Sequence, residues 1–383
     1  MVKISAFHAL KPHSDFIAKV PTKTYSQYSK KEIQLEIKNN PHSFLNIISQ
    51  DTLDQKNRFI KIKQQFNAFK DKEILVNSNS KSIYIYKQTN NQYSCTGLIC
   101  GISLNDYGNN KIKRHEKTIK KWEILFAEYL SINQIHAEPV LIAHDGRLDN
   151  LMDSLMIKKS KIFNIKTLDK VQHEVWEINN LTSISNIINF FKKTEKLYIA
   201  DGHHRMASSF RNNKNQMCLA YIVSKNELKT HAFHRLISNI NSPNSIIEKL
   251  NNTFKMRKIA TPNPESDDLQ FYINNNWHVL SVGNVSDEVA KNLQVTKLLQ
   301  LVLKPIFGIK DERKNKNVQF IPGNINIQHY IKNNVKKNDF FFFMKKISIN
   351  TIIKIAEDNQ TTPPKSTFIL PKIPSGLIMM EII

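Results

Sequence analysis

The hydrophobic and polar positions along the chain follow two periods, one typical of helices and one typical of strands. Apolar residues recur every three to four positions in some segments, whereas other short runs are rich in β-branched and aromatic residues. Helices are predicted over 30–39, 56–69, 115–130, 181–192 and 286–303. Strands are predicted over 82–88, 93–103, 196–200, 217–223, 271–282 (as a hairpin) and 339–346. This mixture predicts an α+β fold with mixed sheets.

Residues 238–268, rich in Asn, Ser and Pro, form the least regular stretch, and this pattern fits either a domain junction or a helical insertion. We place a domain boundary at its start. The first predicted region, 1–237, is α+β and contains the main candidate motifs. The second, 238–383, is also α+β and ends in a proline-punctuated loop followed by an apolar strand. A chain of 383 residues is long enough for two such regions.

The strongest local signal is the sequence Asp201-Gly202-His203-His204-Arg205, which follows a short apolar strand and opens a predicted helix. Gly202 permits a positive φ, and the first turn of the helix has free N–H groups, so this unit can bind an anion. Arg205 adds a bidentate phosphate donor, and His203 or His204 can act as a general acid. Asp201 can cap the helix or bind a hydroxyl or a cation such as Mg²⁺. The alternative is an ordinary N-cap beside two surface histidines.

A second motif, Arg114-His115-Glu116, lies at the start of the helix predicted over 115–130. An acidic residue in the first turn stabilises a helix through its dipole, which is one interpretation of Glu116. The other makes Glu116 a general base that deprotonates water or a hydroxyl, with His115 as a neighbouring donor.

Three further segments could contribute polar groups. His234-Arg235 brings a second arginine that could bind the same anion, and Lys365 and Ser366, in a loop stiffened by prolines, could form the wall of an anion site. For each, a surface salt bridge or a plain turn is the alternative. The segment 144–147, His-Asp-Gly-Arg, predicts a turn.

The formal charge of +22 changes this picture little. Only 8 of the 55 basic residues are Arg, and the abundance of Lys, Asn and Ile is typical of an AT-rich genome. The basic residues are spread along the chain, and no nucleic-acid-binding sequence pattern is present, so a nucleic-acid partner is not expected.

Three cysteines fit a reducing compartment. Without a signal-peptide pattern or a long apolar segment, we expect a cytoplasmic protein with no membrane partner.

The motifs as a set resemble the domain-of-unknown-function family 1015. The resemblance rests on residues 7–12, 40–45, 112–118, 199–205 (Ile-Ala-Asp-Gly-His-His-Arg), 234–236, 363–367 (Pro-Pro-Lys-Ser-Thr), 371–372 and 375–377. One position departs from the family pattern, because Ser26 stands where the family has Asp. A role of that Asp in binding would be absent here.

The Asp-Gly-His-His-Arg element is also similar to the phosphate-binding motif of the ParB/sulfiredoxin superfamily, which includes the ADP-dependent free-serine kinase. This resemblance implies a strand-turn-helix phosphate-binding core. It also implies a phosphoryl-transfer enzyme that acts on O-phosphoserine or free serine, as a phosphatase or a kinase, with Mg²⁺ and ADP or ATP as candidate cofactors. Its partner would be a small phosphorylated amino acid or a nucleotide. The alternative is a nucleotide-responsive nucleic-acid-binding protein of the ParB type, which a helix-turn-helix would favour; we identify none.

Overall fold

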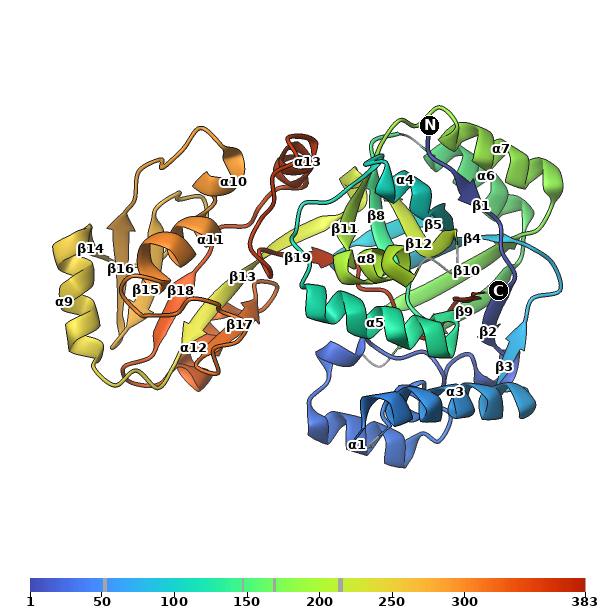
Figure 1. Cartoon of the computed structure of the whole chain (residues 1–383), viewed down its shortest axis with the longest axis horizontal. Helices are drawn as coiled ribbons and strands as arrows, with labels where there is room; N and C mark the ends of the chain where they lie inside the picture. Colours follow the sequence, from blue (N-terminus) through green and yellow to red (C-terminus); the bar gives the residue numbers. More distant parts are fainter. Residues whose placement is uncertain (51–53, 147, 168–169, 213–215, 383) are drawn as a thin grey trace. The chain divides into compact units, whose positions relative to one another are not determined.

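The computed structural model describes residues 1–50, 54–146, 148–167, 170–212 and 216–382 (Figure 1). The chain divides into two compact units. Unit 1 comprises Met1–Arg114, Thr118–Leu228 and Pro371–Ile383. Unit 2 comprises His115–Lys117 and Lys229–Leu370. Each unit contains helices and at least one mixed or antiparallel sheet, so the predicted α+β class is confirmed.

The unit boundaries differ from the predicted division at residue 237. Strand β13 (Lys229–Ile237) belongs to unit 2, because it pairs with three strands of that unit. The end of the chain belongs to unit 1, because β20 (Met379–Glu381) pairs with β2 (Ala9–Pro12) and β7 (Ile135–His136). Pairing between strands so distant in sequence leaves no local pattern, so the sequence does not indicate which unit either segment joins.

Unit 1 is built around a nine-stranded sheet. Its strands, in spatial order, are β6 (Ile112–Lys113), β11 (Leu197–Asp201), β8 (Val140–His144), β12 (Met217–Ser224), β5 (Ser94–Ser103), β4 (Ile83–Thr89), β10 (Gln172–Ile178) and β9 (Lys161–Lys166), with β1 (Ile4–Ser5) beside β5. The β6–β11 and β8–β12 pairs are parallel and the other pairs are antiparallel. The hairpin predicted over 82–103 is confirmed as β4 and β5.

Among the helices of unit 1, α1, α3, α7 and α8 agree with the predicted ones, whereas α2, α4 and α6 were not predicted. They are α1 (Lys30–Asn39), α2 (Leu45–Ile48), α3 (Gln55–Asp71), α4 (Leu104–Gly108), α5 (Lys120–Asn133), α6 (Asp149–Lys158), α7 (Leu181–Phe191) and α8 (His203–Asn212), with single 3₁₀ turns at Ser14–Phe16, Tyr25–Gln27 and Lys225–Glu227. Caps fix their starts: Ser29 and Glu32 form a capping box at α1, and Asn180 caps α7. Ser26, at the position where the family pattern has Asp, lies in the second 3₁₀ turn.

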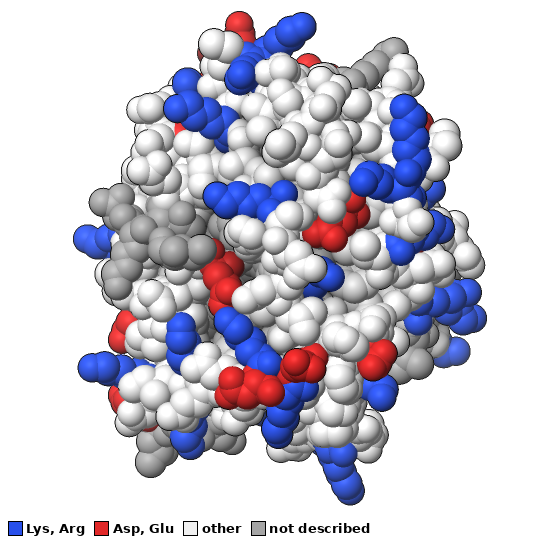
Figure 2. All heavy atoms as spheres, turned by 90° about the vertical axis from the view of Figure 1, so that its right-hand side faces the viewer, with Lys and Arg blue, Asp and Glu red and all other residues white. Residues whose placement is uncertain are grey.

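Lysine and arginine side chains are dispersed over the face of unit 1 shown in Figure 2, with acidic residues among them. No continuous basic stripe crosses the atoms drawn on this face. The interpretation of the net charge as a compositional background stays a prediction. None of the helices that the structure describes is both long and apolar enough to cross a membrane.

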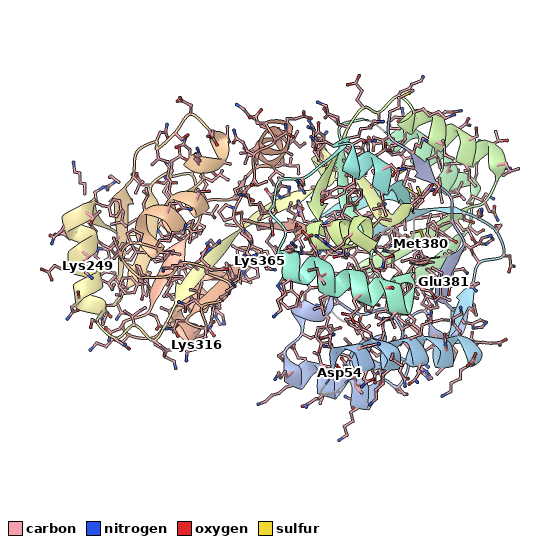
Figure 3. All side chains as sticks on the ribbon, in the orientation of Figure 1. Asp54, Lys249, Lys316, Lys365, Met380 and Glu381 are labelled. Carbon is pink, nitrogen blue, oxygen red and sulfur yellow. The ribbon has the colours of Figure 1, made fainter. Side chains whose placement is uncertain are left out.

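A four-stranded sheet completes unit 1, in the order β3 (Leu75–Asn77), β2, β20 and β7. Its strand β20 carries Met380 and Glu381, which are labelled in Figure 3. Apolar residues of this sheet pack with α2, α3 and α5, including Leu10, Phe66 and Met379. Strand β20 therefore contributes Met379 to the core of unit 1.

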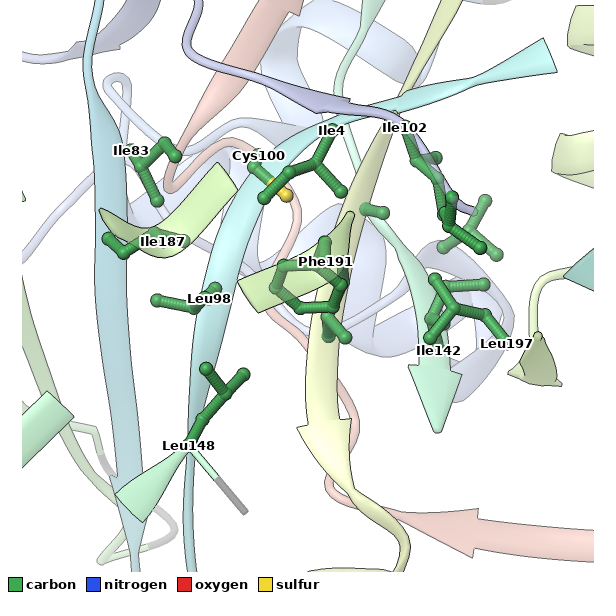
Figure 4. Packing of buried hydrophobic residues seen from close by; sticks show 14 of the residues in the cluster. Ile4, Ile83, Leu98, Cys100, Ile102, Ile142, Leu148, Ile187, Phe191 and Leu197 are labelled. Atoms are coloured by element: carbon green, nitrogen blue, oxygen red, sulfur yellow. The ribbon is translucent and has the colours of Figure 1, made fainter. Parts of the chain in front are cut away.

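The nine-stranded sheet has its own core on one face. Residues of α6 and α7, such as Met152, Ile187 and Phe191, pack there against Leu98, Ile142 and other strand residues (Figure 4). Alternation along the strands puts these apolar side chains on one face and turns Tyr84 and Tyr86 to the other.

Unit 2 contains a seven-stranded sheet, in the order β14 (Lys255–Ile259), β16 (Asn276–Ser281), β15 (Leu269–Ile273), β18 (Phe340–Phe343), β13 and β17 (Val318–Pro322), with β19 (Thr367–Leu370) also paired to β13. Its helices are α9 (Pro243–Thr253), α10 (Val289–Asn292), α11 (Gln294–Lys297), α12 (Ile327–Asn334) and α13 (Ile349–Glu357), plus a π-helix at Leu298–Leu303. The predicted hairpin is confirmed as β15 and β16.

Two predictions for unit 2 can be compared with the structure. The stretch 238–268 contains α9, in agreement with the helical alternative, and also β14, which was not predicted; Pro243 at the first turn of α9 is a start signal that the Asn-rich composition hides. The helix predicted over 286–303 is broken, because Leu293 adopts an extended conformation between α10 and α11.

Candidate active site

The predicted strand, turn and helix around residue 201 are confirmed. Strand β11 ends at Asp201, Gly202 adopts a φ of +94°, and α8 begins at His203. The backbone N–H of Met206 donates to the carbonyl of Gly202 at 3.0 Å and closes the first turn. The positive φ of Gly202 turns the chain sharply from strand to helix, which leaves the first N–H groups of α8 at the end of β11.

Arg205 lies directly against this turn. A Cβ atom built on Gly202 would be only 3.1 Å from Nε and Nη2 of Arg205, so the guanidinium covers the glycine. Its Nη1 donates to the carbonyl of Pro139 at 2.5 Å and lies 3.3 Å from Oε2 of Glu138. Among described residues, the hydrogen bonds and ion pair of Arg205 use Nη1, which leaves the Nε and Nη2 edge for a ligand.

We expect Gly202→Ala to unfold more easily than the wild type, by about 1–3 kcal/mol, because an alanine is strained at this φ. The added methyl group would also push the Arg205 guanidinium away, so phosphate affinity falls as well. Urea unfolding and phosphate titration measure the two effects. Gly283→Ala is the matched control, since a Cβ there meets no atom within 4 Å. Equal stability of both variants would contradict this account.

Lys372 is a site residue for which the sequence predicted no role. Its Nζ donates to Oδ2 of Asp201 at 2.8 Å. Partial burial raises the pKa of Asp201, but the charges of Lys372 and Arg205 and the hydrogen bond from Lys372 lower it well below its usual range. Asp201 is therefore ionised at neutral pH. The Pro371-Lys372 pair was visible as part of the family resemblance, but no local pattern linked it to Asp201.

The two histidines of the motif face different acidic groups. His203 is buried, and its charge helps to lower the pKa of Asp201. His204 instead acts on Glu123 of α5: burial raises the pKa of Glu123, while hydrogen bonds from Thr118 and Arg211 and the charge of His204 lower it. Of the two predicted proton donors, His203 is the one electrostatically coupled to Asp201.

The start of the long helix was predicted wrongly, because α5 begins at Lys120 rather than at residue 115. His115–Lys117 belong to unit 2, where Glu116 forms a parallel bridge with Thr362. The carbonyl of the buried His115 accepts hydrogen bonds from the backbone N–H and the hydroxyl of Thr362, at 2.8 and 3.1 Å. Since Glu116 is not in a helix, its interpretation as a helix-stabilising residue is excluded, and its role as a base stays a prediction.

Arg235 was predicted to bind phosphate, but the structure gives it another role. Its side chain is fully buried in unit 2. Nε donates to Glu312 at 2.9 Å, Nη1 donates to the carbonyl of Phe233 at 2.5 Å, and the guanidinium stacks 4.9 Å from the ring centroid of Phe320. Arg235 is thus a buried partner of Glu312, because its strand β13 is a central strand of the sheet.

In the proline-rich loop, the two predicted phosphate-binding residues Lys365 and Ser366 differ in exposure. The hydroxyl of the buried Ser366 donates to the carbonyl of Pro363, so it stabilises the loop instead of contacting phosphate as predicted. Lys365 is exposed, and its ammonium lies 5.3 Å from the ring centroid of Phe233 (Figure 3). A phosphate-binding role of Lys365 stays a prediction.

The structure describes no metal centre. Among the described residues, no three His, Cys, Asp or Glu side chains are grouped as metal ligands. The cation beside Asp201 is the ammonium of Lys372. Mg²⁺ at Asp201 therefore stays a prediction.

The turn predicted at 144–147 begins where β8 ends at His144, and Asp145 pairs with Lys225 at 2.6 Å. Arg147 lies outside the described residues.

Comparisons with known proteins agree with the family resemblance. The model of the family described as "Protein of unknown function (DUF1015)" matches residues 4–301. No curated protein matches the sequence. The solved structures that are similar include free serine kinase in complex with AMP, at 14% identity and a TM-score of 0.42, covering 74% of this chain and 91% of that chain.

Two other similar structures have comparable scores. SbnI with C-terminal truncation, from Staphylococcus aureus, has 10% identity and a TM-score of 0.42, covering 71% of this chain and 82% of that chain. A conserved hypothetical protein from Pyrococcus furiosus has 14% identity and a TM-score of 0.41, covering 73% of this chain and 94% of that chain. The family match extends over most of the chain, whereas these structural likenesses are distant.

Proposed function

The chain belongs to the DUF1015 family, and we propose that it is a phosphoryl-transfer enzyme acting on O-phosphoserine or free serine. The observation that carries the proposal is the position of Arg205. Its guanidinium lies flat against Gly202, and its Nε and Nη2 edge stands beside the first turn of α8. A guanidinium edge and the N–H groups of a helix terminus together match the oxygens of a phosphoryl group.

The charges around this turn suit a ligand that brings its own negative charge. Arg205 and Lys372 are held by Glu138 and Asp201, so the described ion pairs are balanced in the free protein. The Lys372–Asp201 pair is partly exposed, so solvent screening keeps this interaction weak enough to be exchanged. A bound phosphoryl group would gain two cationic contacts that become stronger as charge develops during transfer.

The remaining roles follow from the chemistry of serine phosphate. In hydrolysis, water attacks phosphorus, the bond to the serine oxygen breaks, and that oxygen takes a proton, for which we assign His203. In the kinase direction, the serine hydroxyl attacks the terminal phosphorus of ATP or ADP, the bond to the bridging oxygen breaks, and O-phosphoserine and ADP or AMP form; run in reverse, O-phosphoserine and ADP give serine and ATP. Glu116 is assigned as the base that deprotonates water or the serine hydroxyl. If Mg²⁺ is required, Asp201 is its candidate ligand and the ion would neutralise phosphate charge.

The direct test is to incubate the purified full chain with O-phosphoserine and Mg²⁺, with and without ADP, and to follow phosphate, ATP and serine. Phosphate release without ADP identifies a phosphatase, and ATP formation identifies a reversible kinase. Absence of turnover in both conditions, together with no binding of O-phosphoserine, would refute the proposed function.

We expect Arg205→Met to weaken O-phosphoserine binding by about 10- to 100-fold, since a charge-assisted bidentate contact is lost. Isothermal titration measures the change. The matched control is Arg211→Met, because Arg211 is also in α8 and also pairs with a glutamate, Glu123, at 2.8 Å. If the two variants bind equally well, Arg205 does not contact the phosphoryl group.

A further inference from the structure

We infer that the carboxy-terminal segment 371–377 completes the phosphate site: Lys372 is a further phosphate-binding residue, and Ser375 acts with Glu138 to position Arg205. The inference rests on the proposed function and adds residues to the same site. It is drawn from contacts between segments far apart in the chain, since Lys372 and Asp201 are separated by 171 positions.

A hydrogen bond to its backbone holds Lys372 near the turn at Gly202. Its carbonyl accepts a hydrogen bond from Nε2 of Gln88 at 3.2 Å, which fixes the main chain against strand β4. Its side chain is 22% exposed and reaches Oδ2 of Asp201, the residue that immediately precedes Gly202. The ammonium therefore contacts a residue that lies two positions before His203, where α8 begins and where phosphate would bind. It can exchange Asp201 for a phosphoryl oxygen without a change in the fold.

Glu138 and Ser375 hold Arg205 from the other side. Oε1 of Glu138 accepts a hydrogen bond from the hydroxyl of Ser375, and its Oε2 lies 3.3 Å from Nη1 of Arg205. Nη1 contacts Glu138 and the carbonyl of Pro139, and in this arrangement Nε and Nη2 lie beside Gly202. Glu138 is thus a positioning residue that acts through Arg205.

Ser375 itself is fixed by its surroundings. It is fully buried, and its N–H and carbonyl both bond to the backbone of Thr22, at 2.9 and 3.1 Å. The next residue, Gly376, has a φ of +76°, and a Cβ there would lie 2.5 Å from the ring of Phe44. The ring contact and the positive φ both require glycine. The Ser-Gly pair is therefore a rigid support rather than a mobile tail.

The first experiment compares Lys372→Met with Lys70→Met by titrating the full chain with inorganic phosphate and with O-phosphoserine. Both lysines form a 2.8 Å ion pair within unit 1, and the partner of Lys70 is Glu381 of β20. Figure 3 labels Glu381. We expect Lys372→Met to weaken binding by about 10-fold or more and Lys70→Met to leave it unchanged.

The second experiment separates positioning from charge. Removal of the negative charge of Glu138 would by itself tighten phosphate binding, since repulsion is lost. If Glu138 positions Arg205, Glu138→Ala instead binds phosphate more weakly. Glu138→Gln binds at least as tightly as the wild type, because its amide oxygen can still accept from Arg205 while its NH2 group donates to the hydroxyl oxygen of Ser375. Thermal unfolding of each variant checks that the fold is retained.

Binding by the wild type separates a failure of this inference from a failure of the proposed function. If the wild type binds neither phosphate nor O-phosphoserine, the proposed function and this inference both fall. If the wild type binds and Lys372→Met binds equally well, Lys372 is only a structural partner of Asp201. If Glu138→Ala binds as tightly as the wild type or more tightly, Glu138 has no positioning role.

Discussion

Replacing Glu116 with glutamine is expected to lower turnover of O-phosphoserine by about 10²- to 10⁴-fold, the usual contribution of a general base. Glutamine has nearly the same shape but cannot accept a proton. The bridge to Thr362 uses backbone atoms, so it should survive the substitution. The assay compares kcat and the affinity for O-phosphoserine in the wild type and the variant.

A loss in kcat with unchanged affinity identifies Glu116 as a group that acts in the chemical step. The control is Glu128→Gln, which removes an exposed carboxylate of α5 and should be silent. Equal kcat values for the wild type and Glu116→Gln would exclude Glu116 as the base. The proposed binding of phosphate at α8 does not depend on this result.

The free energy of unfolding is expected to fall as the pH is lowered from about 6.5 to about 4, because three buried histidines are kept neutral by the fold. Burial lowers the pKa of His136, His144 and His234 to about 4 in each case. Arg205 adds to the effect at His136 and Arg235 at His234, whereas Asp149 and Asp145 oppose it at His144.

The sign follows from the unfolded chain, in which histidine has a pKa of about 6.5 and binds protons that the folded protein excludes. Each histidine should cost about 2 kcal/mol of stability at pH 5 relative to pH 7. Urea unfolding at pH 7, 6 and 5 measures the change. His144→Leu should reduce the pH dependence by roughly one third, the share of one of three equal groups. A pH-independent stability over this range would contradict the buried neutral state.

The local structure of the candidate site was predictable because its signals are local. The apolar strand before Asp201, the glycine at 202 and the periodicity of α8 are adjacent in sequence, and each acts through backbone preferences. Strong periodicity likewise predicted α1, α3, α7 and the two hairpins. Where composition obscured the pattern, as around α9, the sequence left a domain junction and a helical insertion both open.

Glu116 shows the limit of this approach. The residues after Arg114 have a helical pattern that begins too early, because nothing in the pattern indicates the bridge that Glu116 forms with Thr362. Arg235 shows that a local sequence pattern also does not indicate whether a charged residue is buried. A rare arginine next to a histidine favoured an anion site, whereas burial in a central strand makes it the partner of Glu312.

The sequence by itself determined the α+β class, the strand-turn-helix unit at 197–212 and the family, since these depend on periodicity, on glycine and on contiguous motifs. Tertiary structure alone decided what surrounds Gly202. Lys372 and Ser375 reach the site because β20 pairs with β2 and β7, and Glu138 reaches it because β7 leads into β8. Such pairings come from strand hydrogen bonds and core packing over long sequence separations, and no local sequence pattern encodes which charges they bring together.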